Sequence, residues 1–199
     1  MKVFGIKLSW FFAIVAVAIS IALVQRDAVH RAAIDDAIAL NAEVLSSMSE
    51  KQALVFGGTS GIGQAIAERL AKGGASVTIV GRNEAAGAAI VERMSLSAPP
   101  ATAAGAVPSF NFIKADLSIM SNGAAAVKQF VSGNGAAQRL DYLVFCQTKA
   151  TLQGYTPTEG DGIDEKLALN YYSRVFIADL LMPLLEKTAK MMGTGTQRP

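Results

Sequence analysis

The sequence predicts a doubly wound α/β fold, an incomplete parallel sheet of about four strands with helices on both faces, preceded by an apolar helix. From Lys51 onward, short apolar runs alternate with segments of helical periodicity, which is the pattern of a parallel sheet. The first run enters a glycine-rich turn, and a helical segment leaves it. A nearly all-apolar block stands near the N-terminus. A chain of 199 residues has room for one domain of ordinary size and such an appendage.

The N-terminal block, residues 8–24, is uncharged and contains three adjacent aromatic residues. A helix over it would extend about 25 Å, slightly less than the hydrocarbon core of a bilayer. Adding residues 3–6, and letting the Lys7 side chain reach the surface, makes it long enough. We therefore predict a transmembrane or signal-anchor helix over residues 1–25. A signal peptide cleaved after the small residues 16–18 is the open alternative.

Residues 26–50 are rich in alanine, and their apolar and acidic side chains fall mostly on opposite helical faces, so they predict a linker helix. The single histidine, His30, has no candidate partner nearby in the sequence, and we interpret it as solvated. Mixed charges flank the apolar block on both sides, so charge bias does not set its orientation in a membrane.

Composition excludes several kinds of function. The formal net charge is +2, and no basic stripe is interleaved with aromatic residues, so nucleic acid is not an expected partner. The only cysteine, Cys146, excludes an intramolecular disulfide and is expected to be a small buried residue. No group of His, Cys, Asp or Glu has metal-ligand spacing, so no metal site is expected.

Local signals mark where the helices of the domain begin and end. Gly73 and Gly74 are suited to end its first helix, and Asn83 is suited to cap the start of the second. Either Ser118 or Ser121 could cap the third.

These signals divide the domain, assigned to residues 51–190, into alternating elements, and a disordered tail is expected at 191–199. The expected strands are 53–56, 75–80, 110–114 and 139–145, the expected helices are 62–72, 84–94, 118 or 121 to 131, and 163–187 with a bend at Pro183, and 95–108 is a loop.

The turn from Gly57 to Gly63 has glycines spaced as G-x-x-x-G-x-G. A strand that turns sharply into a helix presents free backbone N–H groups and the positive end of the helix dipole. Some of the glycines would adopt positive φ, and others would let a pyrophosphate and a neighbouring strand approach. The strand–turn–helix context predicts a dinucleotide site, with an ordinary tight turn as the alternative.

Arg82 stands at the end of the second strand, where an NAD site usually carries an acidic residue for the ribose 2′-hydroxyl. An arginine suits a 2′-phosphate and gains little from a free hydroxyl, so the sequence favours NADP over NAD, with a solvated arginine as the alternative. Asp116 and Leu117 end the third strand, where a carboxylate could accept from an adenine amino group while its neighbour packs on the ring. Taken alone, Asp116 would be interpreted as a helix N-cap.

The motifs that follow one another along the chain are Gly57-x-x-x-Gly61-Ile62-Gly63, Gly81-Arg82-Asn83, Asp116-Leu117, Leu140-Asp141-Tyr142-Leu143-Val144 and Leu169-Asn170-Tyr171-Tyr172. In this order they resemble the short-chain dehydrogenase/reductase family, in the manner of its retinol-dehydrogenase-like and fungal NADP-linked members. The resemblance covers residues 51–187, roughly the N-terminal half of such a domain. It implies a Rossmann-type sheet, an NAD(P) cofactor, and hydride transfer between a carbonyl and an alcohol.

The resemblance also implies roles for individual residues. Arg82 would bind the 2′-phosphate, with Asn83 beside it, and Asp116 and Leu117 would bind the adenine. Asn170 matches a catalytic asparagine that helps hold a proton relay. The residues implied to line the pyrophosphate and ribose are Gly57, Thr59, Ser60, Gly61, Ile62 and Gly63.

The chain departs from the family pattern in two places. Residues 145–148 read Phe-Cys-Gln-Thr where the family has Asn-Asn-Ala-Gly, and the β-branched Thr148 could hamper the approach of the cofactor. Family catalysis uses a tyrosine and a lysine four residues later, whose charge lowers the tyrosine pKa. No Tyr-x-x-x-Lys occurs in the sequence, so we expect a chain truncated before that motif and catalytically incomplete.

The expected function is that of an NAD(P)-dependent oxidoreductase of this type, whose longer form would act on an apolar carbonyl or alcohol. A non-catalytic half domain that binds a nucleotide or a partner is the alternative. The expected location is the endoplasmic reticulum membrane, with the domain facing the cytosol, or secretion if the apolar block is cleaved. The fourth strand is expected to form a bare sheet edge.

Overall fold

The computed structural model describes residues 2–3, 6–7, 48–100, 107–133 and 139–193. The chain divides into two compact units, Met1–Val44 and Leu45–Pro199. In the first unit, the short strands β1 (Lys2–Val3) and β2 (Ile6–Lys7) pair antiparallel. The predicted apolar helix at 8–24 and almost all of the linker helix lie outside the described residues. Among the described helices, none is long and apolar enough to cross a membrane.

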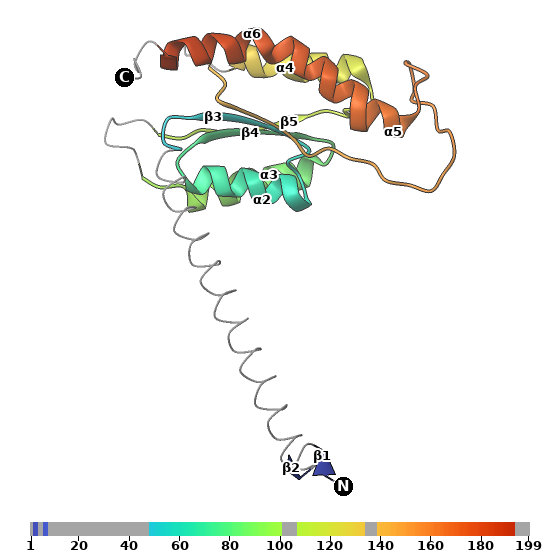
Figure 1. Cartoon of the computed structure of the whole chain (residues 1–199). Coiled ribbons are helices and arrows are strands. Elements are labelled where there is room, and N and C mark those ends of the chain that lie inside the picture. Colours follow the sequence, from blue (N-terminus) through green and yellow to red (C-terminus); the bar gives the residue numbers. More distant parts are fainter. Residues whose placement is uncertain (1, 4–5, 8–47, 101–106, 134–138, 194–199) are drawn as a thin grey trace. The chain divides into compact units, whose positions relative to one another are not determined.

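The second unit is built on four parallel strands (Figure 1). They are β3 (Gln52–Phe56), β4 (Ser76–Gly81), β5 (Phe110–Lys114) and β6 (Tyr142–Phe145), in the order β5-β4-β3-β6. Phe56 lies opposite Val80 on one side and Phe145 on the other, so the carboxyl ends of the strands reach the same edge. This order confirms the predicted fold class. β6 pairs with β3 and stands at an edge of the sheet, with half-buried side chains, as expected.

Helices cover both faces of this sheet (Figure 1). On one face, α2 (Gly61–Lys72) and α3 (Glu84–Ser97) pack over alternate strand residues such as Val55 and Ile79. On the other face, α4 (Met120–Gly133) and α6 (Ser173–Gly193) pack over the intervening residues. The inner strands are therefore buried on both faces, which explains why they read as continuous apolar runs rather than as alternating ones.

The predicted caps are confirmed for α2 and α3. The Asn83 side chain accepts a hydrogen bond from the Ala86 N–H at 3.0 Å. Gly73 caps α2, and Gly74 follows with a φ of 90°, which allows Ala75 to donate back to the Leu70 carbonyl at 3.1 Å.

The start of α4 is different from the one expected. The helix begins at Met120, so Ser121 lies inside it and Ser118 lies two residues before it. The Met120 N–H instead donates to the Asp161 carboxylate at 2.9 Å, a residue 41 positions along the chain. The orphan donor of the first turn is thus satisfied by a distant loop, which no local sequence signal reveals.

The last helical stretch has three parts where one helix was expected. A short α5 (Glu165–Leu167) leads into the π-helical turn η2 (Ala168–Tyr172), and α6 follows directly. Pro183 lies inside α6, and the helix continues past it to Gly193. The predicted tail is therefore wrong for residues 191–193, which are helical, while 194–199 lie outside the described residues.

Candidate functional site

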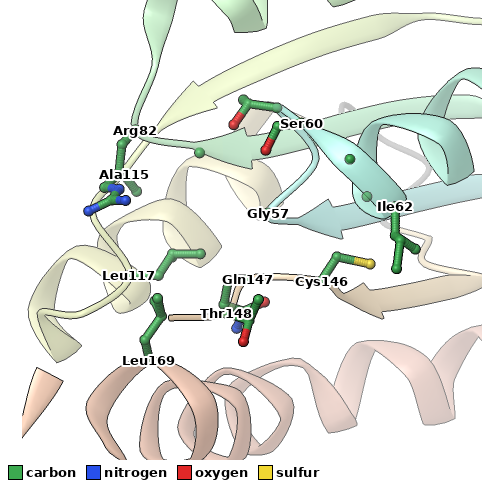
Figure 2. A pocket seen from close by; sticks show the side chains of 14 residues that line it. Gly57, Ser60, Ile62, Arg82, Ala115, Leu117, Cys146, Gln147, Thr148 and Leu169 are labelled. Atoms are coloured by element: carbon green, nitrogen blue, oxygen red, sulfur yellow. The ribbon is translucent and has the colours of Figure 1, made fainter. Parts of the chain in front are cut away.

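A cavity of about 280 Å³ opens at the carboxyl edge of the sheet. One wall is the turn that follows β3, and the facing wall is the chain that follows β6 (Figure 2). Of the predicted cofactor residues, eight line it: Gly57, Thr59, Ser60, Gly61, Ile62, Gly63, Arg82 and Leu117. Thr148, expected near the approach of the cofactor, also lines the cavity, and the lining residues that sequence reasoning missed are Gly81, Ala115, Cys146, Gln147 and Leu169.

Two glycines let these walls touch. A Cβ added to Gly57 would lie 2.3 Å from the Gln147 backbone nitrogen. A Cβ added to Gly63 would lie 2.2 Å from the Gly57 carbonyl oxygen and 2.9 Å from the Cβ of Cys146. The expectation that glycine admits a neighbouring strand is therefore confirmed, since the turn packs directly on the chain that leaves β6. Gly61 has a different role: it has open space around it, and its φ is 55°.

The N-terminus of α2 faces this cavity with its donors uncapped. Ser60 occupies the N-cap position, and its side chain makes no capping hydrogen bond within the described residues. The first turn of α2 contains no acidic residue. First-turn N–H groups and the positive helix end together favour an anion such as a pyrophosphate.

Arg82 stands at one end of the cavity, beside Ala115 and Leu117 (Figure 2). Its side chain is 63% exposed, and its Nη1 lies 3.9 Å from the Asp116 carboxylate. At that distance and exposure the ion pair is weak, so the guanidinium is available to a second anion.

Asp116 and Asn83 do not line the cavity, although both were predicted to bind cofactor. The Asp116 carboxylate accepts hydrogen bonds from the Ser118 N–H at 3.0 Å and hydroxyl at 2.7 Å, so it stabilises the turn after β5. Because α4 begins at Met120, Asp116 is not its N-cap either. Asn83 is occupied as the cap of α3. Both side chains follow a strand end, where nearby backbone N–H groups donate hydrogen bonds to them.

Asn170, the predicted catalytic residue, lies in the π turn η2 and outside the cavity lining. Its amide oxygen accepts from the Thr148 hydroxyl and from the Lys149 N–H, each at 3.0 Å. Its amide nitrogen donates to the Lys149 carbonyl at 2.9 Å. Asn170 thus holds the loop after β6 in place, while its neighbour Leu169 lines the cavity. π turns recur at functional sites, which agrees with this position.

Residues 146–148 form the facing wall, of which sequence reasoning had placed only Thr148 beside the cofactor. Thr148, the β-branched departure from the family pattern, lines the cavity with its hydroxyl bonded to Asn170. Cys146 is half-buried and packs near Gly63, rather than fully buried as expected. The rule that ligands bind outside the carboxyl ends of parallel strands, applied to β6, would have found this wall. Within the described residues, no cluster of His, Cys, Asp or Glu could hold a metal ion.

Comparison with known proteins places these features in one family. The family model described as short chain dehydrogenase matches residues 51–193. Oxidoreductase AN1596 of Emericella nidulans is 35% identical over 147 residues, which are 73% of this chain and 41% of that protein. The chain therefore spans about two fifths of the length of this curated relative and of oxidoreductase andH of Emericella variicolor.

Solved structures agree on the fold. The NADP active-site complex of Pseudomonas aeruginosa RhlG superposes with a TM-score of 0.53 at 31% identity, over 70% of this chain and 50% of that chain. NADH-dependent reductase A1-R′ complexed with NAD superposes with a TM-score of 0.58 at 24% identity, over 75% of this chain and 58% of that chain. The second likeness is one of fold alone.

Proposed function

Because the chain belongs to the short-chain dehydrogenase/reductase family, we propose that its cavity binds an NAD(P) dinucleotide and prefers NADP. The observation that carries the preference is Arg82, an exposed guanidinium at the end of the cavity and of β4. A planar cation of this kind suits the doubly charged 2′-phosphate of NADP better than the free hydroxyl of NAD.

The residues present fit such a cofactor. The glycine turn is a cradle that a Cβ would fill at Gly57 and Gly63, and the uncapped start of α2 offers backbone donors to the pyrophosphate. Leu117 and Ala115 supply an apolar wall for a base at the Arg82 end. A bound NADPH would supply hydride for exchange between a carbonyl and an alcohol. The residues of this chain bind and orient it.

Titration with NADPH, followed by fluorescence, tests this proposal. We expect saturable binding by the wild-type chain and about ten- to a hundredfold weaker binding by Arg82→Ala, because a charge-assisted contact to the phosphate is lost. Binding of NADH should be unchanged. The control is Lys114→Ala, which removes a cation at the end of β5 that is paired with Glu84 and does not line the cavity. Wild-type protein that shows no binding at millimolar NADPH would contradict the proposal.

A second candidate is a binding protein without turnover, and the tyrosines favour it. The residues four positions after Tyr142, Tyr155, Tyr171 and Tyr172 are Cys146, Glu159, Val175 and Phe176. None of these tyrosines lines the described cavity. Tyr155 donates its hydroxyl to the Gly162 carbonyl, and Tyr171 and Tyr172 pack edge-to-face on each other.

We expect the 199-residue chain to oxidise NADPH no faster than background with a panel of aldehydes and ketones, because it offers no tyrosine–lysine pair for proton transfer. Consumption of NADPH would be monitored by its absorbance in the presence of each carbonyl. Turnover that depends on substrate would remove this candidate and favour an enzyme with a different proton donor. For a longer form, we propose an apolar carbonyl or alcohol as the substrate.

We also propose that residues 1–25 anchor the protein in the endoplasmic reticulum membrane, with the domain facing the cytosol. The uncharged apolar run at 8–24 supports this, and it is long enough to span with its neighbours. The full chain expressed in eukaryotic cells should stay in the membrane pellet after extraction with alkaline carbonate. The chain lacking residues 1–25 should move to the supernatant. A shortened, carbonate-soluble product of the full chain would instead favour a cleaved signal peptide.

A further inference from the structure

Gln147 stands in the cavity wall with an unused amide. The residue is 6% exposed and lies two positions after the end of β6. Neither its Nε2 nor its Oε1 has a hydrogen-bond partner in the described part of the chain, and both atoms are shut off from solvent. Burying a primary amide in this way costs free energy on both its donor and its acceptor side.

The backbone of Gln147 is fixed by contacts that do not involve this amide. Its carbonyl accepts a hydrogen bond from the Arg174 guanidinium on α6. Its backbone nitrogen packs against Gly57, so closely that a Cβ on that glycine would lie 2.3 Å away. The segment is held from both sides and cannot shift outward to hydrate the side chain. Because the backbone is fixed, only rotation of the side chain can bring the amide into the cavity, where a ligand would meet it.

None of the other described side chains of this wall is hydrogen-bonded to that amide. Leu117 and Leu169 are apolar, and the Thr148 hydroxyl already donates to Asn170. Figure 2 shows Gln147 across the cavity from Ser60, on the wall opposite the α2 N-terminus. The anionic groups of a ligand would bind the α2 N-terminus on that opposite side and the Arg82 guanidinium. What Gln147 faces must then be a part of the ligand that is neutral and polar.

We propose that the side-chain amide of Gln147 turns into this cavity when a dinucleotide binds and contacts one of its sugar hydroxyls. A hydroxyl both donates and accepts, so it matches an amide that needs both, whereas a phosphate only accepts and would leave Oε1 unsatisfied. The contact rests on the proposed function, because it needs a dinucleotide in the cavity. It makes Gln147 a cofactor-binding residue at a position where the family pattern has alanine.

The variant Gln147→Leu separates the effect of this amide on the stability of the ligand-free chain from its effect on NADPH affinity. Removing an unsatisfied amide leaves the stability of the ligand-free chain equal or higher, because an apolar side chain suits the buried position better. The same change weakens NADPH binding about tenfold to a hundredfold, because the sugar loses its partner. Gln147→Met, which is unbranched like glutamine, repeats the experiment with a different shape. Gln129→Leu, on the exposed side of α4, is the matched control with no change in affinity.

Stability would be measured by urea unfolding without ligand, and affinity by fluorescence titration with NADPH and with adenosine 2′,5′-bisphosphate. A loss for both probes assigns the contact to the adenosine sugar, and a loss for NADPH alone assigns it to the nicotinamide sugar. Equal affinity of wild type and both variants overturns the inference. So does destabilisation of both variants, which would show that the amide has a partner within the protein. Absence of NADPH binding by wild type is a distinct result, since it contradicts the proposed function itself.

Discussion

Replacing Gly63 by alanine should destabilise the second unit by about 3 kcal/mol or more, which is among the largest effects expected of one methyl group. The new Cβ would lie 2.2 Å from the carbonyl oxygen of Gly57, and this neighbour is backbone in a tight turn that cannot rotate away. The chain after β6 would be pushed off the turn, and NADPH binding would fall with it. Urea unfolding monitored by far-UV circular dichroism gives the loss directly.

Gly61→Ala is the matched control for that experiment, two residues before Gly63 in the same turn. No atom lies within 4 Å of the Cβ that it would add. Its cost is the strain of alanine at a φ of 55°, about 1 to 2 kcal/mol. If both variants lost the same free energy, backbone strain would explain the pair, and the contact between the two cavity walls would not be the decisive factor.

The second large effect is expected from Asp141→Asn, at the start of β6. The carboxylate is 2% exposed and accepts from the Arg139 guanidinium at 2.6 and 2.7 Å and from the Gln52 N–H at 2.9 Å. It joins β6 to β3 at the end opposite the cavity. An asparagine would remove the negative charge that Arg139 contacts and turn an N–H group toward another donor. We expect a loss of about 3 kcal/mol at pH 7, measured by urea unfolding.

The pH dependence gives an independent measure of the same carboxylate. Burial alone would raise the pKa of Asp141, but the hydrogen bonds from Arg139 and Gln52 outweigh it and hold the pKa below its ordinary value. The contribution to stability is therefore complete above the pKa of the unfolded chain, about 4, and is lost as the pH falls through the lower folded value. Unfolding free energies measured from pH 7 to pH 3 should fall less steeply for Asp141→Asn than for wild type. Asp179→Asn, on the exposed face of α6, should follow the wild-type slope.

Local chemistry predicted the elements well, because their signals lie within a few residues. Asn83 caps the helix that follows it, and the strand expected at 110–114 is β5 as observed. The start of α4 could not be predicted in this way, since Asp161 reaches it from a loop 41 residues away.

The candidate site was predictable on one wall and not on the other. The turn at 57–63 could be identified by its glycine spacing, and Arg82 could be identified by its place after β4. Gln147 carries no motif, and its importance appears only when β6 is seated beside β3 and the turn packs on it. Asp116 was assigned to the cofactor from its place at a strand end and Asn83 from the family resemblance, but Ser118 donates to the first side chain and the Ala86 N–H to the second.

The π turn at Ala168–Tyr172 amounts to a single inserted residue in an otherwise α-helical stretch. A regular α-helix over the same residues would rotate everything beyond the turn by about 100°, the angle of one helical residue. Either Ile177 and Leu181 would turn away from the sheet, or Asn170 would turn away from Thr148. The insertion is what lets one stretch of helix both pack on the core and hold the loop beside the cavity. A further insertion within these five residues is therefore expected to be tolerated far less than substitutions on their exposed side.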